Sequence, residues 1–122
     1  MPGPCILVVD DDPAIRLLCR VNLELDGYDL VEASTLAEAR AALAEHDVAA
    51  VLLDVHVGPE DGRALLGELR LERPDLPIGL LTGSADPARV VAEVSPDAIV
   101  PKPFTLEQLH EAVHLLTSLR SV

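Results

Sequence analysis

The sequence predicts an α/β fold in which five parallel strands form one sheet with helices on both faces. Five short apolar segments alternate with five segments of helical periodicity along the 122 residues. The apolar segments are nearly continuous, as expected for strands buried on both faces of a parallel sheet. Crossovers of this length are right-handed, and the doubly wound strand order 2-1-3-4-5 fits them. We expect one domain spanning residues 1–122, with its core at about 5–119 and no attached output domain.

The first strand is "CILVV" (5–9), and the helix after it has a clear start signal. Asp12 can cap the helix and Pro13 suits its first position. The helix should run to about Asp26, where Gly27 stops it. One face of this helix carries Leu18, Val21 and Leu25.

The second strand, "YDLVEA" (28–33), carries charge and therefore suits a sheet edge. Ser34 or Thr35 caps the helix that follows, "LAEARAALAEH", whose inward residues are Leu36, Ala39 and Leu43. The remaining strands are expected at 48–54, 77–82 and 98–100, and the remaining helices at 62–72, 86–93 and 105–119. Their buried faces are predicted to hold Leu65, Leu66 and Leu69 in the first of these helices, and Leu106, Leu109, Val113 and Leu116 in the last.

Composition and charge exclude several classes of function. The net charge of -12 repels nucleic-acid phosphates, so we expect no direct contact with nucleic acid. No apolar run reaches the ~18 residues of a membrane span, and the N-terminus lacks the pattern of a signal peptide. We therefore expect a cytoplasmic protein. Cys5 and Cys19 have neither the number nor the spacing of a disulfide framework or zinc site, and we expect both to be small buried side chains.

Polar residues recur where the predicted strands end. In an open parallel sheet, ligands bind beyond the carboxyl ends of the strands, where the strand order reverses. The residues delivered there are Asp10 and Asp11 after the first strand, Asp54 at the end of the third, Thr82 at the end of the fourth and Lys102 after the fifth. The first and third strands are neighbours in the predicted order. Three carboxylates should therefore share one crevice with a hydroxyl and an ammonium group.

Such a group of carboxylates predicts a bound cation and phosphoryl chemistry. At ~5 Å and an effective dielectric of ~20, each carboxylate pair costs on the order of 3 kcal/mol. Mg²⁺ relieves this repulsion and accepts carboxylates, water and phosphate oxygens. A carboxylate beside Mg²⁺, a lysine and a hydroxyl can act as nucleophile towards phosphorus. Asp54 is then the residue placed to be phosphorylated.

Each of these residues alone has a simpler explanation. Capping is the favoured role of Asp12, and capping or solvation accounts equally well for Asp10 and Asp11 taken singly. Their placement together with the polar ends of the other strands favours the site. His110 and His114, four residues apart on the last helix, could hold a metal, but a solvated or partner-facing surface is the favoured interpretation.

Four segments, "ILVVDDDPAIRLL", "VLLDVHVGPEDG", "LLTGS" and "VPKPF", resemble the signature segments of the response-regulator receiver domain of two-component signalling. The resemblance extends from about Cys5 to Leu119 and implies a flavodoxin-like (βα)5 fold. It implies that a histidine kinase or phosphotransfer protein passes a phosphoryl group from phosphohistidine to Asp54 in a Mg²⁺-dependent reaction. A partner-binding surface then switches, and the downstream partner is unknown. A homodimer could form through the face made by the fourth helix, fifth strand and fifth helix.

The resemblance also implies a role for each residue of the site. Asp11 binds Mg²⁺ directly, Asp10 largely through water, and Asp54 and the main-chain carbonyl of His56 are further ligands. Thr82 and Lys102 contact the phosphoryl group, and the Lys102–Pro103 peptide bond is expected to be cis.

Several positions depart from the usual receiver pattern. Gly58 stands where Pro is frequent, Ile99 replaces the usual switch aromatic, and His56 and Ser84 are expected to affect the rate of dephosphorylation. The chain would then be a switch and not an enzyme acting on a foreign substrate. Two rivals are a phosphatase of the haloacid dehalogenase type, which needs a second Asp where His56 stands, and a pure interaction module or a receiver excised from a longer protein.

Overall fold

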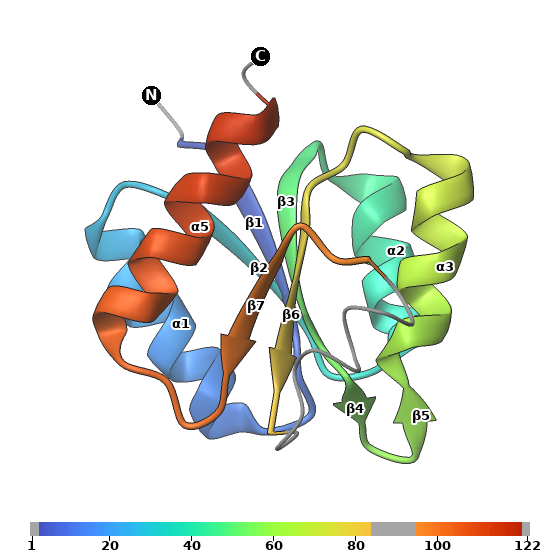
Figure 1. Cartoon of the computed structure of the whole chain (residues 1–122), viewed down its shortest axis with the longest axis horizontal. Coiled ribbons are helices and arrows are strands. Elements are labelled where there is room, and N and C mark those ends of the chain that lie inside the picture. The colour runs from blue at the N-terminus through green and yellow to red at the C-terminus, as the bar shows by residue number, and fades with distance from the viewer. Residues whose placement is uncertain (1–2, 84–94, 121–122) are drawn as a thin grey trace.

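A five-stranded parallel sheet forms the centre of the molecule in the computed structural model, which describes residues 3–83 and 95–120 (Figure 1). Its strands are β1 (Cys5–Val9), β2 (Asp29–Ala33), β3 (Val48–Asp54), β6 (Ile78–Thr82) and β7 (Ala98–Pro101). Their order across the sheet is β2-β1-β3-β6-β7. Counted along the chain, the strands of this sheet have the predicted order 2-1-3-4-5. The charged strand β2 lies at one edge, as its sequence predicts.

Helices cover both faces of the sheet and enclose two separate cores. The helices are α1 (Pro13–Leu25), α2 (Leu36–Glu45), α3 (Gly62–Glu72) and α5 (Leu106–Arg120). Figure 1 shows α1 and α5 on one face and α2 and α3 on the other. Strand side chains alternate between the two cores, so that Ile6 and Val8 face one and Leu7 and Val9 the other. The helix predicted at 86–93 and Ser84 lie outside the described residues, and so does part of the predicted dimer face.

Side-chain caps fix where the helices begin. The Asp12 carboxylate accepts a hydrogen bond from the Ala14 N–H, and Pro13 occupies the first turn of α1. At α2 the cap is Thr35, whose hydroxyl accepts from the Glu38 N–H. Glu38 in turn accepts from the N–H of Ser34, which completes a reciprocal cap. The predicted role of Asp12 is confirmed.

The apolar face of α1 seen in the sequence is not the face that meets the core. Leu18, Val21 and Leu25 do share a face, but they are 37%, 50% and 83% exposed. The sheet instead packs against Cys19 and Leu23, which are fully buried. The helix carries apolar residues on two opposite sides, and its periodicity alone does not say which side meets the sheet.

Two smaller predictions also need correction. Leu109, Val113 and Leu116 of α5 are buried, but Leu106 is 44% exposed. Leu106 lies in the first turn of the helix, and Phe104 packs against the core at this end instead. Of the two cysteines, Cys19 is buried, whereas Cys5 is only half-buried because it opens β1 at the margin of the sheet.

A small hairpin follows β3 and was not predicted. It pairs β4 (His56–Val57) with β5 (Glu60–Asp61) in antiparallel fashion. Gly58 opens its two-residue turn at a φ of 60°, a conformation that favours glycine, and Pro59 follows. Gly58, which stands where receivers frequently have Pro, is therefore a residue of this hairpin turn. Within residues 3–83 and 95–120, no helix is long and apolar enough to cross a bilayer.

Candidate phosphoacceptor site

Three carboxylates meet at the carboxyl edge of the sheet. β1 and β3 are parallel neighbours with Val9 opposite Leu53, so the residues that follow these positions lie side by side. One oxygen from each of Asp10, Asp11 and Asp54 lies within 4.8 Å of the others. Among the described residues, no other group of three acidic, histidine or cysteine side chains converges in this way. Asp10 is fully buried, Asp54 nearly so, and Asp11 is exposed.

Lys102 places its ammonium group between two of these carboxylates. Its Nζ lies 2.7 Å from Oδ2 of Asp10 and 3.2 Å from Oδ2 of Asp54. The residue follows β7, and its N–H donates to the carbonyl oxygen of Thr82 at 2.7 Å. The Lys102–Pro103 peptide bond is cis, as predicted.

The pKa values of Asp54 and Lys102 are both raised, for different reasons. Burial raises the pKa of Asp54, the Asp10 charge raises it further, and Lys102 and the His56 N–H offset part of this. Burial alone would lower the pKa of Lys102, but the hydrogen bond and charge of Asp10, together with Asp54, raise it overall. The site therefore disfavours the ionised form of Asp54 and favours the charged form of Lys102.

Thr82 and His56 complete the set predicted from the sequence. Thr82 ends β6 and is 2% exposed, one position beyond the pairing of Asp54 with Leu81. The His56 N–H points back to Oδ1 of Asp54 at 3.3 Å, while its side chain is exposed. The structure thus brings all the residues predicted for the site to one edge, and their roles there remain predictions.

Gly62 is a supporting residue that the sequence reasoning missed. A Cβ atom at this position would lie only 2.0 Å from the carbonyl oxygen of Asp54. The Gly62 N–H also donates to the carbonyl oxygen of Val55 at 2.7 Å. The start of α3 therefore rests directly on the backbone of Asp54. A glycine immediately after a helix-capping aspartate, Asp61, was the available signal.

The donor set suits a hard cation of the size of Mg²⁺. The converging side-chain atoms are carboxylate oxygens, and an exposed Asp11 leaves room for water ligands. Because these oxygens lie within 4.8 Å of one another, each carboxylate pair repels by at least about 3.5 kcal/mol at an effective dielectric of ~20, and a divalent cation would relieve this repulsion. Zn²⁺ would call for His or Cys donors, and the cluster contains neither.

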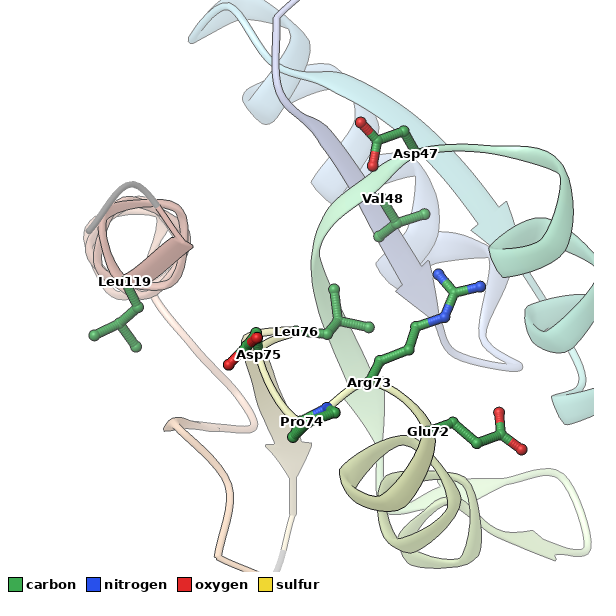
Figure 2. Close-up of a pocket in the computed structure, with 8 residues that line it drawn as sticks. All are labelled: Asp47, Val48, Glu72, Arg73, Pro74, Asp75, Leu76 and Leu119. Atoms are coloured by element: carbon green, nitrogen blue, oxygen red, sulfur yellow. The ribbon is translucent and has the colours of Figure 1, made fainter.

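Two other hollows formed by described residues lack a converging set of three possible metal ligands. One of about 660 Å³ lies at the opposite edge of the sheet, beside Val48 at the start of β3 (Figure 2). Its guanidinium group, on Arg73, donates to the carbonyl oxygen of Leu43 at 2.9 Å. His110 and His114 line another hollow of about 450 Å³ with Asp26, but their donor atoms do not form a converging set of three. His114 is exposed, as the predicted surface role requires. His110 is half-buried, and its Nε2 is buried without a hydrogen-bond partner among the described residues, so the prediction of a solvated side chain is wrong there.

Comparisons with known proteins agree with this geometry. Residues 6–114 match the model of the response regulator receiver domain. The transcriptional regulatory protein KdpE of Mycobacterium tuberculosis is 36% identical over 105 residues, covering 84% of this chain and 46% of its own. The transcriptional regulatory protein AruR of Pseudomonas aeruginosa is 41% identical over 113 residues, covering 87% and 46%. The chain thus spans about half the length of these curated relatives.

Solved receiver structures have the same fold. A CheY-like receiver domain protein from Methanospirillum hungatei superimposes with a TM-score of 0.86 at 27% identity, over 98% of both chains. The response regulator TrrA of Thermotoga maritima, solved in complex with Mg²⁺ and BeF, gives a TM-score of 0.83 at 32% identity, over 93% of this chain and 98% of its own. The matching family model, the relatives and the shared fold together show that this chain belongs to the response regulator receiver domain family of two-component signalling.

Proposed function

We propose that Asp54 is the residue of this receiver that accepts the phosphoryl group, in a reaction assisted by Mg²⁺. The observation that supports this most strongly is the position of its carboxylate at the end of the buried strand β3. One oxygen lies 3.2 Å from Nζ of Lys102, and the other accepts the His56 N–H at 3.3 Å. These contacts hold an acidic nucleophile in place beside a cation site.

The proposed step forms one bond and breaks another. A carboxylate oxygen of Asp54 attacks phosphorus as the P–N bond of a phosphohistidine breaks, and the electron pair leaves with the imidazole nitrogen. Lys102 pairs with the phosphoryl oxygens, and the Thr82 hydroxyl donates to them. Mg²⁺, held by Asp10, Asp11, Asp54 and the main-chain carbonyl of His56, would neutralise charge on the transferring group. The product is an acyl phosphate on the chain itself.

The donor in this proposal is a histidine kinase or a phosphotransfer protein, and the exposed face of α1 is its docking surface. Leu17, Val21 and Leu25 are 60%, 50% and 83% exposed on this face. α1 begins at Pro13, directly after the acidic residues that follow β1, so the face lies next to the site. Such an apolar helix face suits packing against helices of a partner, which would bring its phosphohistidine to Asp54.

The phosphorylated chain would act as a switch in the cytoplasm rather than as an enzyme with a foreign substrate. A second protein would read the change of its surface, and the negative charge of the chain favours a protein reader over nucleic acid. KdpE and AruR are named transcriptional regulatory proteins, and a role in controlling transcription through a partner is a consistent extension.

Intact-mass analysis tests the phosphoacceptor. Acetyl phosphate with Mg²⁺ should add one phosphoryl group to the chain, and Asp54→Asn should abolish the addition. Asp75→Asn, which removes the same charge at an exposed position, should leave it unchanged. Equal labelling of the Asp54→Asn variant would refute the assignment. Sustained release of phosphate from small phosphomonoesters would instead favour a phosphatase.

A further inference from the structure

Every polar main-chain and side-chain group of Asp10 is held by a different part of the fold. Its N–H donates to the carbonyl oxygen of Ala33 at 3.1 Å, and its Oδ1 accepts from the Asp12 N–H at 2.9 Å. Oδ2 accepts from Nζ of Lys102 at 2.7 Å. The fourth contact is that of its carbonyl oxygen, which accepts from Nη1 of Arg16 at 2.7 Å.

The contact from Arg16 controls the peptide unit that leads to Asp11. The Asp10 carbonyl and the Asp11 N–H belong to one planar group, so holding the oxygen sets the direction in which the chain continues. Asp11 is exposed, and packing does little to fix its side chain. Its carboxylate nevertheless has an oxygen within 4.8 Å of those of Asp10 and Asp54. The orientation of this peptide is therefore what keeps the third carboxylate at the site.

We propose that Arg16 is a positioning residue of the cation site, acting through the Asp10–Asp11 peptide. This inference rests on the proposed function, because it assumes that Asp10, Asp11 and Asp54 bind Mg²⁺. Arg16 touches neither the ion nor the phosphoryl group in this account. It links the loop between β1 and α1 to the carboxylate of Glu32 on β2, the strand next to β1.

The guanidinium group is itself anchored on its other side. Its Nε donates to Oε1 of Glu32 on β2 at 3.2 Å, and the Arg16 side chain is only 18% exposed. The second oxygen of Glu32 accepts from Nε of Arg20 at 2.6 Å. A planar guanidinium can donate to a carboxylate and a carbonyl at the same time in fixed directions, which the single ammonium of lysine does less well.

Arg20 supplies a matched control within the same helix. It lies one turn after Arg16, carries the same charge and contacts the same Glu32, and its other side-chain contact is with Glu24 at 2.6 Å. Its hydrogen bonds go to these two glutamates and not to the loop that bears Asp10. Replacing Arg20 therefore removes one positive charge and the bonds to Glu32 and Glu24, and leaves the Asp10 carbonyl contact in place.

A role of Arg16 through its charge and a role through positioning predict opposite changes in the affinity of the site for Mg²⁺. A positive side chain near a cation site repels the cation, so if Arg16 acted only by its charge, Arg16→Met would tighten Mg²⁺ binding. If Arg16 acts by position, Arg16→Met weakens binding although the repulsion is gone. Arg16→Lys separates the two effects further, because it keeps the charge and loses the fixed pair of donors.

The experiment measures the Kd for Mg²⁺ of the ion-free chain by isothermal titration calorimetry at constant ionic strength. Residues that orient metal ligands typically change metal affinity by roughly 10- to 100-fold when they are replaced. We expect Arg16→Met and Arg16→Lys each to weaken Mg²⁺ binding by roughly tenfold, and Arg20→Met to change it by less than about twofold. Thermal unfolding without Mg²⁺ reports any general loss of stability, which should be similar for Arg16→Met and Arg20→Met.

Three outcomes would overturn the inference. These are tighter binding by Arg16→Met, unchanged binding by both Arg16 variants, and equal weakening by Arg20→Met. If Arg16→Met does not fold, the Kd of Arg16→Lys is compared with that of Arg20→Lys, and weaker Mg²⁺ binding by Arg16→Lys alone supports the inference. A wild-type chain that binds no Mg²⁺ would refute the proposed function itself, whereas normal wild-type binding with unaffected variants refutes only the role of Arg16.

Discussion

Replacing Asp54 by asparagine should stabilise the chain when no Mg²⁺ is present. The change removes a charge that burial disfavours and that Asp10 repels. The converging oxygens of Asp10 and Asp54 lie within 4.8 Å of each other, so at an effective dielectric of ~20 their repulsion is at least about 3.5 kcal/mol. The same calculation gives about 5 kcal/mol for the lost attraction to Lys102 at 3.2 Å. Burial adds to the repulsion, and the pKa of Asp54 is raised overall, so these two effects outweigh the attraction to Lys102. We therefore expect the free energy of unfolding to rise by on the order of 1 kcal/mol.

The pKa of Asp54 gives the pH dependence of this gain. Burial and then the Asp10 charge raise the pKa of Asp54, so ionising it costs the folded state free energy at neutral pH. As the pH falls through the raised pKa of the folded chain and then below the ordinary value of 3.8, Asp54 becomes protonated in both states. The advantage of asparagine should therefore be full at pH 7 and should shrink as the solution is acidified.

Urea denaturation followed by circular dichroism, with a chelator present, measures this effect. Asp75→Asn is the control, since it changes the net charge by the same amount at an exposed position far from the site. Saturating Mg²⁺ should reverse the order, because the ion stabilises the wild type and binds the variant less well. A lower free energy of unfolding for Asp54→Asn than for wild type without Mg²⁺ would refute the electrostatic reasoning.

Three further predictions concern the support of the site and its partner. Lys102→Ala should lower the free energy of unfolding by at least about 2 kcal/mol, since it leaves the buried Asp10 carboxylate without its ammonium partner. Because the pKa of Lys102 is raised, this contribution is present below pH 10.5 and lost as the pH rises through the folded value, and urea titrations across that range check it. Gly62→Ala should destabilise by about 2 kcal/mol or more through its clash with the Asp54 carbonyl, whereas Gly67→Ala, with open space around its Cβ, should stabilise α3 by about 0.5 kcal/mol in thermal unfolding. Val21→Glu should slow phosphotransfer from a phosphorylated kinase at least about tenfold and leave labelling by acetyl phosphate unchanged, and equal slowing of both reactions would contradict docking on α1.

The sequence predicted most of the sheet because every strand but the charged β2 is a short apolar run bounded by polar or turn-forming residues. β3 was predicted at its observed bounds for this reason. The site followed from one rule, that residues after adjacent parallel strands meet at one edge. This is why Asp10 and Asp54 could be placed together although they are far apart in the chain.

The features that were missed depend on contacts that sequence patterns do not encode. The buried side of α1 does not follow from its sequence because both of its sides are apolar, and only packing against the sheet selects Cys19 over Val21. The contact of Gly62 with the Asp54 backbone and the contact of Arg16 with the Asp10 carbonyl each join a helix to a loop. Neither follows from periodicity, because both depend on how closely two backbones approach.

A crystal structure of the chain with Mg²⁺ and beryllofluoride tests the central claim most directly. We expect the beryllium to bond to a carboxylate oxygen of Asp54, with Lys102 beside its fluorides. The ion should be bound by Asp11, Asp54 and the main-chain carbonyl of His56, with Asp10 close by. Beryllofluoride on another residue, or Mg²⁺ away from these oxygens, would contradict it.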